Sequence, residues 1–153
     1  MTVLLGSSGV CWSAYWEKGV DAYKRGDYAT VWEKGVDVYK RGDYSTALKE
    51  WTLLAEQGNA DAQYLLGGMY FIGEGVPQDY KTAVKWTTLA AEQRDVRAQS
   101  NLGLMYANGQ GVPQDDKTAV KWFRLGAEQG NASAQTSLGF MHQNGRGAPQ
   151  VDK

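Results

Sequence analysis

A 36-residue repeat is the feature that most constrains the fold of this chain. Residues 61–96 align with residues 97–132 without a gap, and 22 of the 36 positions are identical. A third copy begins at residue 133 and stops partway through its unit at residue 153. Self-similarity at such a period is the signature of architectures in which each unit packs on its neighbours. We therefore expect a solenoid rather than a domain with a single central core.

Each copy of the repeat is predicted to form two helices. Apolar residues gather on one face of a helix over roughly 61–72, and Gly73 then ends it, where a C-terminal cap favours a residue that tolerates positive φ. Asp79 is a natural N-cap for a second helix that runs to about Gln93. In this second helix the residues expected to pack in the core are Ala83, Trp86, Leu89 and Ala90, with Ala119, Trp122 and Leu125 in the next copy.

The chain contains 19 glycines, a content usually associated with loops. The repeat places most of them at a few recurring sites, namely helix ends, loop turns and the interiors of the first helices. Gly67, Gly103 and Gly139 belong to the last group, where glycine costs about 0.5–1 kcal/mol relative to alanine. We expect this cost to be offset by close approach of a neighbouring helix, under a bulky tryptophan of that helix.

The N-terminal part of the chain departs from the 36-residue pattern. Residues 32–60 form a shorter, tetratricopeptide-like first unit in which Arg41-Gly42-Asp43 replaces the longer loop. Residues 16–30 repeat almost unchanged as residues 32–46. We expect a disordered or vestigial leader over 1–11, an extra helix within 12–31, and helices near 12–25, 28–41 and 44–57, broken at Gly26 and Gly42. The duplicated helix either caps the solenoid or competes with its copy for one docking surface on the helix near 44–57. Such competition would permit self-association.

The spacing and the loop G-x-G-V-x-x-D resemble the Sel-one-like repeat, a relative of the tetratricopeptide repeat. The residues that carry the resemblance are Ala62, Leu66, Gly67, Tyr70, Gly73, Gly75, Val76, Asp79, Ala83, Trp86, Ala90 and Ala91. It covers roughly residues 32–153 and implies an all-α, right-handed superhelical solenoid of antiparallel helix pairs that binds proteins. One branch of this family carries a disulfide in each repeat; a single cysteine excludes that arrangement here.

The residues offer little basis for catalysis, and no cofactor or metal is expected. The lone Cys11 and the lone His142 exclude a multi-cysteine metal site and a pair of histidine ligands. Asp115-Asp116 could act as paired carboxylates, but Asp115 matches the N-cap Asp79. Arg-Gly-Asp at 25–27 and 41–43 fits integrin adhesion or a helix break, and Asn131 fits a glycosylation site or a turn.

The remaining function is binding. In stacked helix pairs, positions that change between units face solvent or ligand. By resemblance to related solenoids, the first helices line the concave surface and offer a groove for an extended peptide or a helix. The candidate partner-binding residues on this surface are Tyr64, Leu65, Phe71, Asn101, Leu104, Asn108, Phe140 and Gln143.

Charge and hydropathy limit the kind of partner. A net charge of −1 gives no electrostatic footprint for nucleic acid, and no apolar run is long enough for a membrane span. The third copy lacks its second helix, which predicts self-association through that end or a chain cut from a longer array. The compartment stays open between the cytoplasm and export to the periplasm of a bacterium.

We therefore predict a non-catalytic protein-interaction module that acts as an adaptor or scaffold. Two alternatives stay open. One is a hydrolase that binds cell-wall compounds, as some relatives do. The other is an engineered or rearranged repeat protein without a partner, which the 16-residue duplication suggests.

Overall fold

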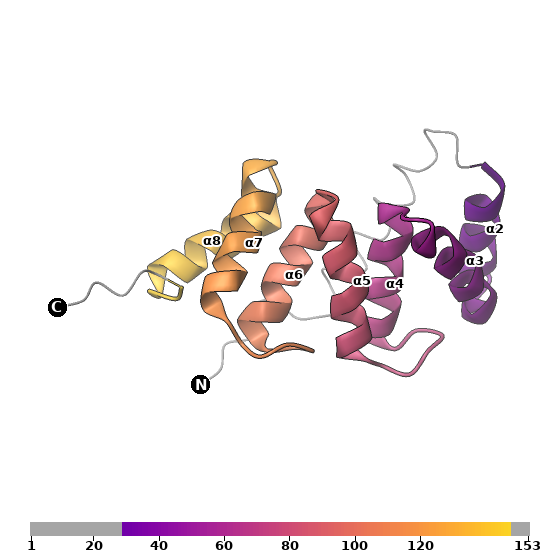
Figure 1. The fold of residues 1–153 in the computed structure, drawn as a ribbon, viewed down its shortest axis with the longest axis horizontal. Helices are drawn as coiled ribbons and strands as arrows, with labels where there is room; N and C mark the ends of the chain where they lie inside the picture. Colours follow the sequence, from indigo (N-terminus) through magenta and orange to yellow (C-terminus); the bar gives the residue numbers. More distant parts are fainter. Residues whose placement is uncertain (1–28, 148–153) are drawn as a thin grey trace.

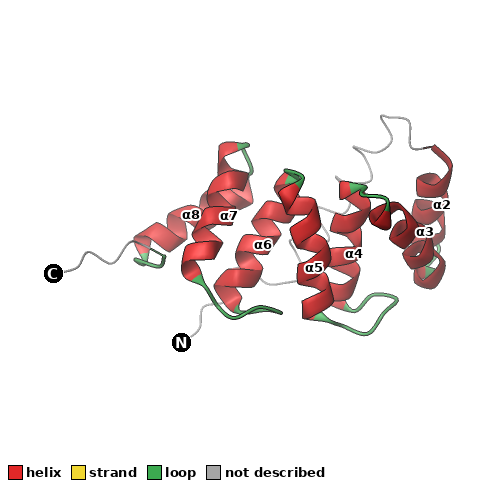
Figure 2. Ribbon diagram, in the orientation of Figure 1, coloured by secondary structure: helices red, strands yellow, loops and turns green. Residues whose placement is uncertain are grey.

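The computed structural model describes residues 29–147, which form seven helices and no strand (Figure 1, Figure 2). The helices predicted at 28–41, 44–57 and 61–72 are confirmed to within one residue at each end. The leader, the helix expected at 12–25 and the first copy of the duplication lie outside the described residues, apart from the start of α2. The helices are α2 (Ala29–Lys40), α3 (Tyr44–Glu56), α4 (Ala60–Ile72), α5 (Tyr80–Glu92), α6 (Val96–Asn108), α7 (Asp116–Glu128) and α8 (Ala132–Gln143).

Each helix packs against the next one in the chain, so the described residues form an elongated row of helices (Figure 1). The closest pairs are α4 with α5 and α6 with α7, the two helices of each complete unit. The shorter pair α2 and α3 precedes them, and α8 follows as the first helix of a third unit. This arrangement is an all-α solenoid, as the repeat predicts.

Short polar side chains start the helices, as the sequence predicts. The Asp79 carboxylate accepts hydrogen bonds from the backbone N–H groups of Lys81 and Thr82, and Asp115 repeats this arrangement 36 residues later. The hydrogen bond from the Thr82 hydroxyl lowers the pKa of Asp79 below its usual value. Glycine ends the first helices: Gly73 is the C-cap of α4 and adopts the left-handed conformation with φ +76°. These local contacts fix where each helix begins and ends.

The core lies between the two layers of helices, but the second helices contribute less to it than predicted. Ala83 and Ala90 of α5 are fully buried, and so is Thr87 between them. Leu89 is 37% exposed, so its predicted place in the core is wrong, and Leu125 in α7 is wrong in the same way. The reason is angular: residue 89 lies about 200° around the helix from residue 87, which faces the first helix.

Gly67 and Gly103, inside the first helices, let a neighbouring helix come close as expected, whereas a Cβ on Gly139 would meet nothing within 4 Å among the described residues. A Cβ placed on Gly67 would lie 2.4 Å from Thr87 Oγ1, and one on Gly103 would lie 2.6 Å from Phe123. The neighbour is therefore threonine or phenylalanine, and the expectation of a tryptophan is wrong for both positions. Trp86, one residue earlier, is half-buried and packs at the edge of the core.

The loop of each unit reaches back to the preceding unit. A Cβ on Gly75 would lie 2.5 Å from Cβ of Tyr44, and one on Gly111 would lie 2.2 Å from the carbonyl oxygen of Tyr80. Tyr44 and Tyr80 are the first residues of the preceding second helices. The second loop glycine thus has two reasons to lack a side chain, a positive φ and a backbone contact at the joint between units.

Candidate functional site

The eight predicted partner-binding residues all lie on the first helices α4, α6 and α8. The structure divides them into two groups. Tyr64, Leu65, Phe71 and Asn101 are buried, with at most 5% of each side chain exposed. Leu104, Asn108 and Phe140 are half-buried and Gln143 is exposed. The surface that remains open to a partner is therefore smaller than the sequence predicts.

Contacts between units explain part of this burial. The Arg97 guanidinium, from the next first helix, lies 4.4 Å from the centre of the Tyr64 ring. Within its own unit, the Phe71 ring lies 5.1 Å from that of Tyr80 at the start of α5. A position that changes between units can thus serve a contact peculiar to one joint of the solenoid, because each joint brings together a different pair of residues.

Arg97 is the centre of the charged network on this part of the molecule. Its side chain is 14% exposed, and its guanidinium pairs with Asp95 and Asp61. Burial alone lowers the pKa of Arg97, but the hydrogen bonds and charges of Asp95 and Asp61 outweigh burial and raise the pKa above its usual range. The arginine therefore stays charged and joins the start of α6 to the start of α4, which is a structural role.

Two polar side chains of α6 are buried without a hydrogen-bond partner among the described residues. They are the Ser100 hydroxyl, fully buried, and the Asn101 amide nitrogen, in a side chain that is 2% exposed. A buried donor left unpaired costs about 1–3 kcal/mol, so such groups are uncommon in helical cores. The equivalent residues of α4 are Tyr64 and Leu65. This polar pair is therefore specific to α6 and is not part of the repeat pattern.

The open part of the first-helix face lies toward the C-terminal ends of these helices. Leu104 and Phe140 occupy equivalent positions on α6 and α8. Ile72, at the end of α4, is 44% exposed and corresponds to Asn108 of α6. This site combines apolar side chains with an amide, a composition suited to contacts with a peptide. We call Ile72, Leu104, Asn108, Phe140 and Gln143 the first-helix surface.

A ladder of glutamine amides joins consecutive units, and the sequence reasoning missed it. Gln63 Nε2 donates to the carbonyl oxygen of Ala55, and Gln93 Nε2 donates to Gln63 Oε1 at 2.7 Å. Gln99 repeats both contacts: its Nε2 donates to the carbonyl oxygen of Ala91 in the preceding unit, and its Oε1 accepts from Gln129 Nε2 at 2.7 Å within its own unit. The signal was available, because these glutamines recur at a spacing of 36 residues. Their geometry is that of a brace between units rather than a site.

The sequence motifs that suggested chemistry have structural roles where the structure describes them. Asp115 is the N-cap of α7, and Asp116 accepts two hydrogen bonds from the Arg146 guanidinium. Asp43 of the second Arg-Gly-Asp caps α3, and Asn131 caps α8 by accepting from the Ala134 backbone N–H at 2.8 Å. His142 stands at the position of Tyr70 and Tyr106 in the preceding units, and it is exposed, whereas those tyrosines are half-buried.

Neither a metal-binding cluster nor a membrane-spanning helix occurs within residues 29–147. In this range, no group of three or more histidine, cysteine, aspartate or glutamate side chains is placed to hold a metal ion. No helix within it has the length and apolar character needed to cross a membrane.

Comparison with known proteins places this repeat in a family. The Sel1 repeat model matches residues 60–95, 96–131 and 132–153. Among solved structures, the chain resembles a protective antigen present in uropathogenic Escherichia coli strains, which displays an SLR fold. The TM-score is 0.75 with 42% identity over 86% of this chain. A Sel1 repeat protein from Oxalobacter formigenes gives a TM-score of 0.71 with 37% identity over 76% of this chain.

The chain spans 29% of the first of these proteins and 48% of the second. A search of curated proteins found no significant match. The family model covers more than half of the chain, and both solved structures agree with it in fold and in sequence. This chain belongs to the Sel1 repeat family.

Proposed function

We propose that this chain is a non-catalytic interaction module that binds a peptide segment of a partner protein along the first-helix surface. Sel1 repeats are commonly protein-interaction modules, and three of them match this chain. The observation that carries the proposal is the row of equivalent positions on α6 and α8. Leu104 and Phe140 are half-buried there, so each leaves part of an apolar side chain open to a partner, while Leu104 also packs against the core.

The chemistry of the first-helix surface favours an extended segment. Apolar side chains of the peptide would pack on Leu104 and Phe140, while the Asn108 amide can donate to a peptide carbonyl and accept from a peptide N–H. Ser100 and Asn101 of the same helix are buried, so their donors lie beneath this surface and not on it. Tyr64, Leu65 and Phe71 are buried and would support this surface rather than contact the peptide.

A peptide-library selection tests this proposal even while the natural partner is unidentified. A random linear peptide library is selected on the immobilised chain, and the affinities of enriched peptides are measured in solution. We expect Leu104→Asp together with Phe140→Asp to weaken binding at least about 10-fold, since each removes an apolar contact worth roughly 1–3 kcal/mol.

The matched control is Leu125→Asp, which places the same charge on an exposed leucine of the second-helix layer. It should leave peptide affinity unchanged, and circular dichroism should show the same helicity for all variants. Enrichment of no peptide, or equal weakening by Leu125→Asp, would contradict the proposal.

A further inference from the structure

Three leucines stay exposed at the same position of the three described second helices. Leu53 in α3 is 50% exposed, Leu89 in α5 is 37% exposed and Leu125 in α7 is 36% exposed. Exposed single leucines are ordinary, but here the same apolar residue recurs at 36-residue intervals on one side of the solenoid. The three leucines thus form an apolar row that crosses the second-helix layer.

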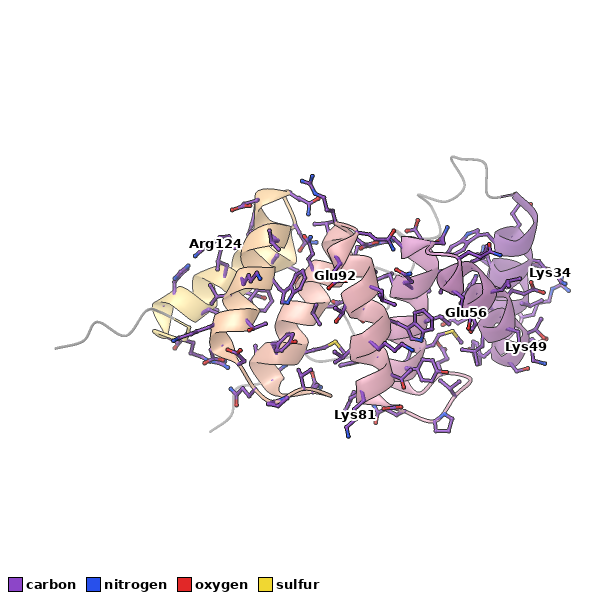
Figure 3. All side chains as sticks on the ribbon, viewed as in Figure 1. Lys34, Lys49, Glu56, Lys81, Glu92 and Arg124 are labelled. Carbon is purple, nitrogen blue, oxygen red and sulfur yellow. The ribbon has the colours of Figure 1, made fainter. Side chains whose placement is uncertain are left out.

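Charges of opposite sign flank this leucine row. Lysine stands four residues before each leucine and glutamate three residues after it, so on each helix the three side chains fall on one face. All six charged residues are exposed, and none forms an ion pair with a described residue. Figure 3 labels three of these six residues, Lys49 and Glu56 on α3 and Glu92 at the end of α5. The lysine row is Lys49, Lys85 and Lys121, and the glutamate row is Glu56, Glu92 and Glu128.

Helix stability does not explain the glutamate row. Glu56, Glu92 and Glu128 are the last residues of α3, α5 and α7, where the helix macrodipole disfavours negative charge. None of these three helices has a basic residue in its last turn. The chain therefore keeps a locally unfavourable charge beside the leucine row on all three described second helices.

From this pattern we infer that the second-helix face binds a second copy of this chain. The face is complementary to itself in one arrangement. A two-fold axis parallel to the leucine row lays leucine on leucine and places the lysine row of each copy opposite the glutamate row of the other. An axis along the helices would instead set lysine against lysine. Charge complementarity thus selects a single symmetric dimer.

The dimer is weak and is centred on α5. Stable interfaces bury about 800 Å² on each partner, and three partly exposed leucines supply only a small part of that area. The association therefore belongs to the transient class, in which charge determines the register more than the affinity. It leaves the first-helix surface free, so peptide binding and dimerisation use opposite layers of the solenoid.

Sedimentation equilibrium of the chain from about 10 µM to about 1 mM tests the inference, since weak dimers form in this range. We expect the average mass to rise from monomer toward dimer. Leu89→Asp together with Leu125→Asp should remove this rise, with helicity unchanged by circular dichroism. A chain that stays monomeric at the highest concentration, or a double variant that still dimerises, would overturn the inference.

Charge reversal separates this dimer from other modes of association. Replacing the three lysines by glutamate sets like charges opposite one another and should abolish dimerisation. Replacing all six residues, each lysine by glutamate and each glutamate by lysine, exchanges the two rows and leaves the net charge at −1. This six-fold variant should dimerise again, within about threefold of the original affinity, because the face remains complementary to itself. A monomeric six-fold variant would show that the proposed two-fold arrangement is wrong.

Discussion

The first unit and the complete units of this solenoid hold their helix pairs together in different ways. In the first unit, α2 and α3 meet through a cluster of aromatic rings, with Trp51 lying 5.6 Å from Trp32 and 5.4 Å from Tyr39. In the next unit the residue equivalent to Trp51 is Thr87, which lies against Gly67. The first unit also has a turn of three residues where the others have a loop that reaches back to the preceding unit. Large rings thus stabilise the unit that makes no such loop contact within the described residues.

The largest difference is expected when the residue at this shared position is truncated to alanine. Trp51 is fully buried, so Trp51→Ala should lower the free energy of unfolding by about 3–5 kcal/mol. Thr87→Ala removes a small side chain whose hydroxyl has no partner in the described residues, and should cost less than about 1 kcal/mol. Urea denaturation followed by circular dichroism measures both. Equal losses would mean that the aromatic cluster contributes little to the first unit.

The next prediction concerns the loop that only the complete units possess. Gly111 has φ +75°, and an added Cβ would also lie 2.2 Å from the carbonyl oxygen of Tyr80. Gly42, in the short turn of the first unit, has φ +83° with nothing within 4 Å. Gly42→Ala should therefore cost about 1 kcal/mol for its backbone conformation alone. Gly111→Ala should cost about 1–3 kcal/mol more, because backbone at the joint has to move. Matching losses of stability in the two variants would contradict a tight joint.

A smaller effect is expected at the turns between units. Gly58 and Gly130 have positive φ at equivalent turns, but the turn after α5 has Arg94 with φ +69°. Arg94→Gly should therefore raise the free energy of unfolding by up to about 1 kcal/mol. The control is Arg124→Gly inside α7, which should lower it by about 1 kcal/mol. Thermal denaturation of both variants checks the two signs, and a loss of stability in Arg94→Gly would show that its side chain has a compensating contact.

The smallest effect concerns a feature that both regions share, the aspartate at the start of the second helix. The hydrogen bond from the Thr82 side chain is the largest cause that lowers the pKa of Asp79, and Thr46 acts in the same way on Asp43. Because the pKa is lower in the folded chain, this contribution to stability is present above the unfolded pKa. It is lost as pH falls through the folded pKa.

Thr82→Ala should therefore raise the pKa of Asp79 toward its usual value and reduce stability at about pH 7, with a smaller difference at about pH 3. Thr46→Ala should do the same for Asp43. Carboxyl chemical shifts measured by NMR across the acid range give the two pKa values. A shift at one aspartate only would show that the caps differ between the first unit and the complete ones.

Much of the fold could be predicted because its signals are local. The N-cap at Asp79 and the C-cap at Gly73 depend on residues within four positions of each other, and the repeat shows the same pattern twice. The candidate site was harder to predict. Comparison of the units identified the variable positions of the first helices, but could not tell that Tyr64 lies against Arg97 while Leu104 stays partly open.

The second helices show the same limit. Leu89 follows two residues after the buried Thr87, and its apolar character suggested a place in the core that the helix geometry does not give it. A leucine is apolar wherever it stands. Which face the helix turns toward its neighbour decides whether that leucine is buried or exposed.

The sequence by itself determined the repeat, the helix pairs, their caps and the family, because periodicity and capping depend on residues close together in the chain. Only the tertiary structure decided which variable residues are buried at the joints, which glycines touch a neighbouring helix, and which apolar residues remain on the surface. Those outcomes depend on how two helices approach each other, and that distance and angle result from all the side chains between them at once.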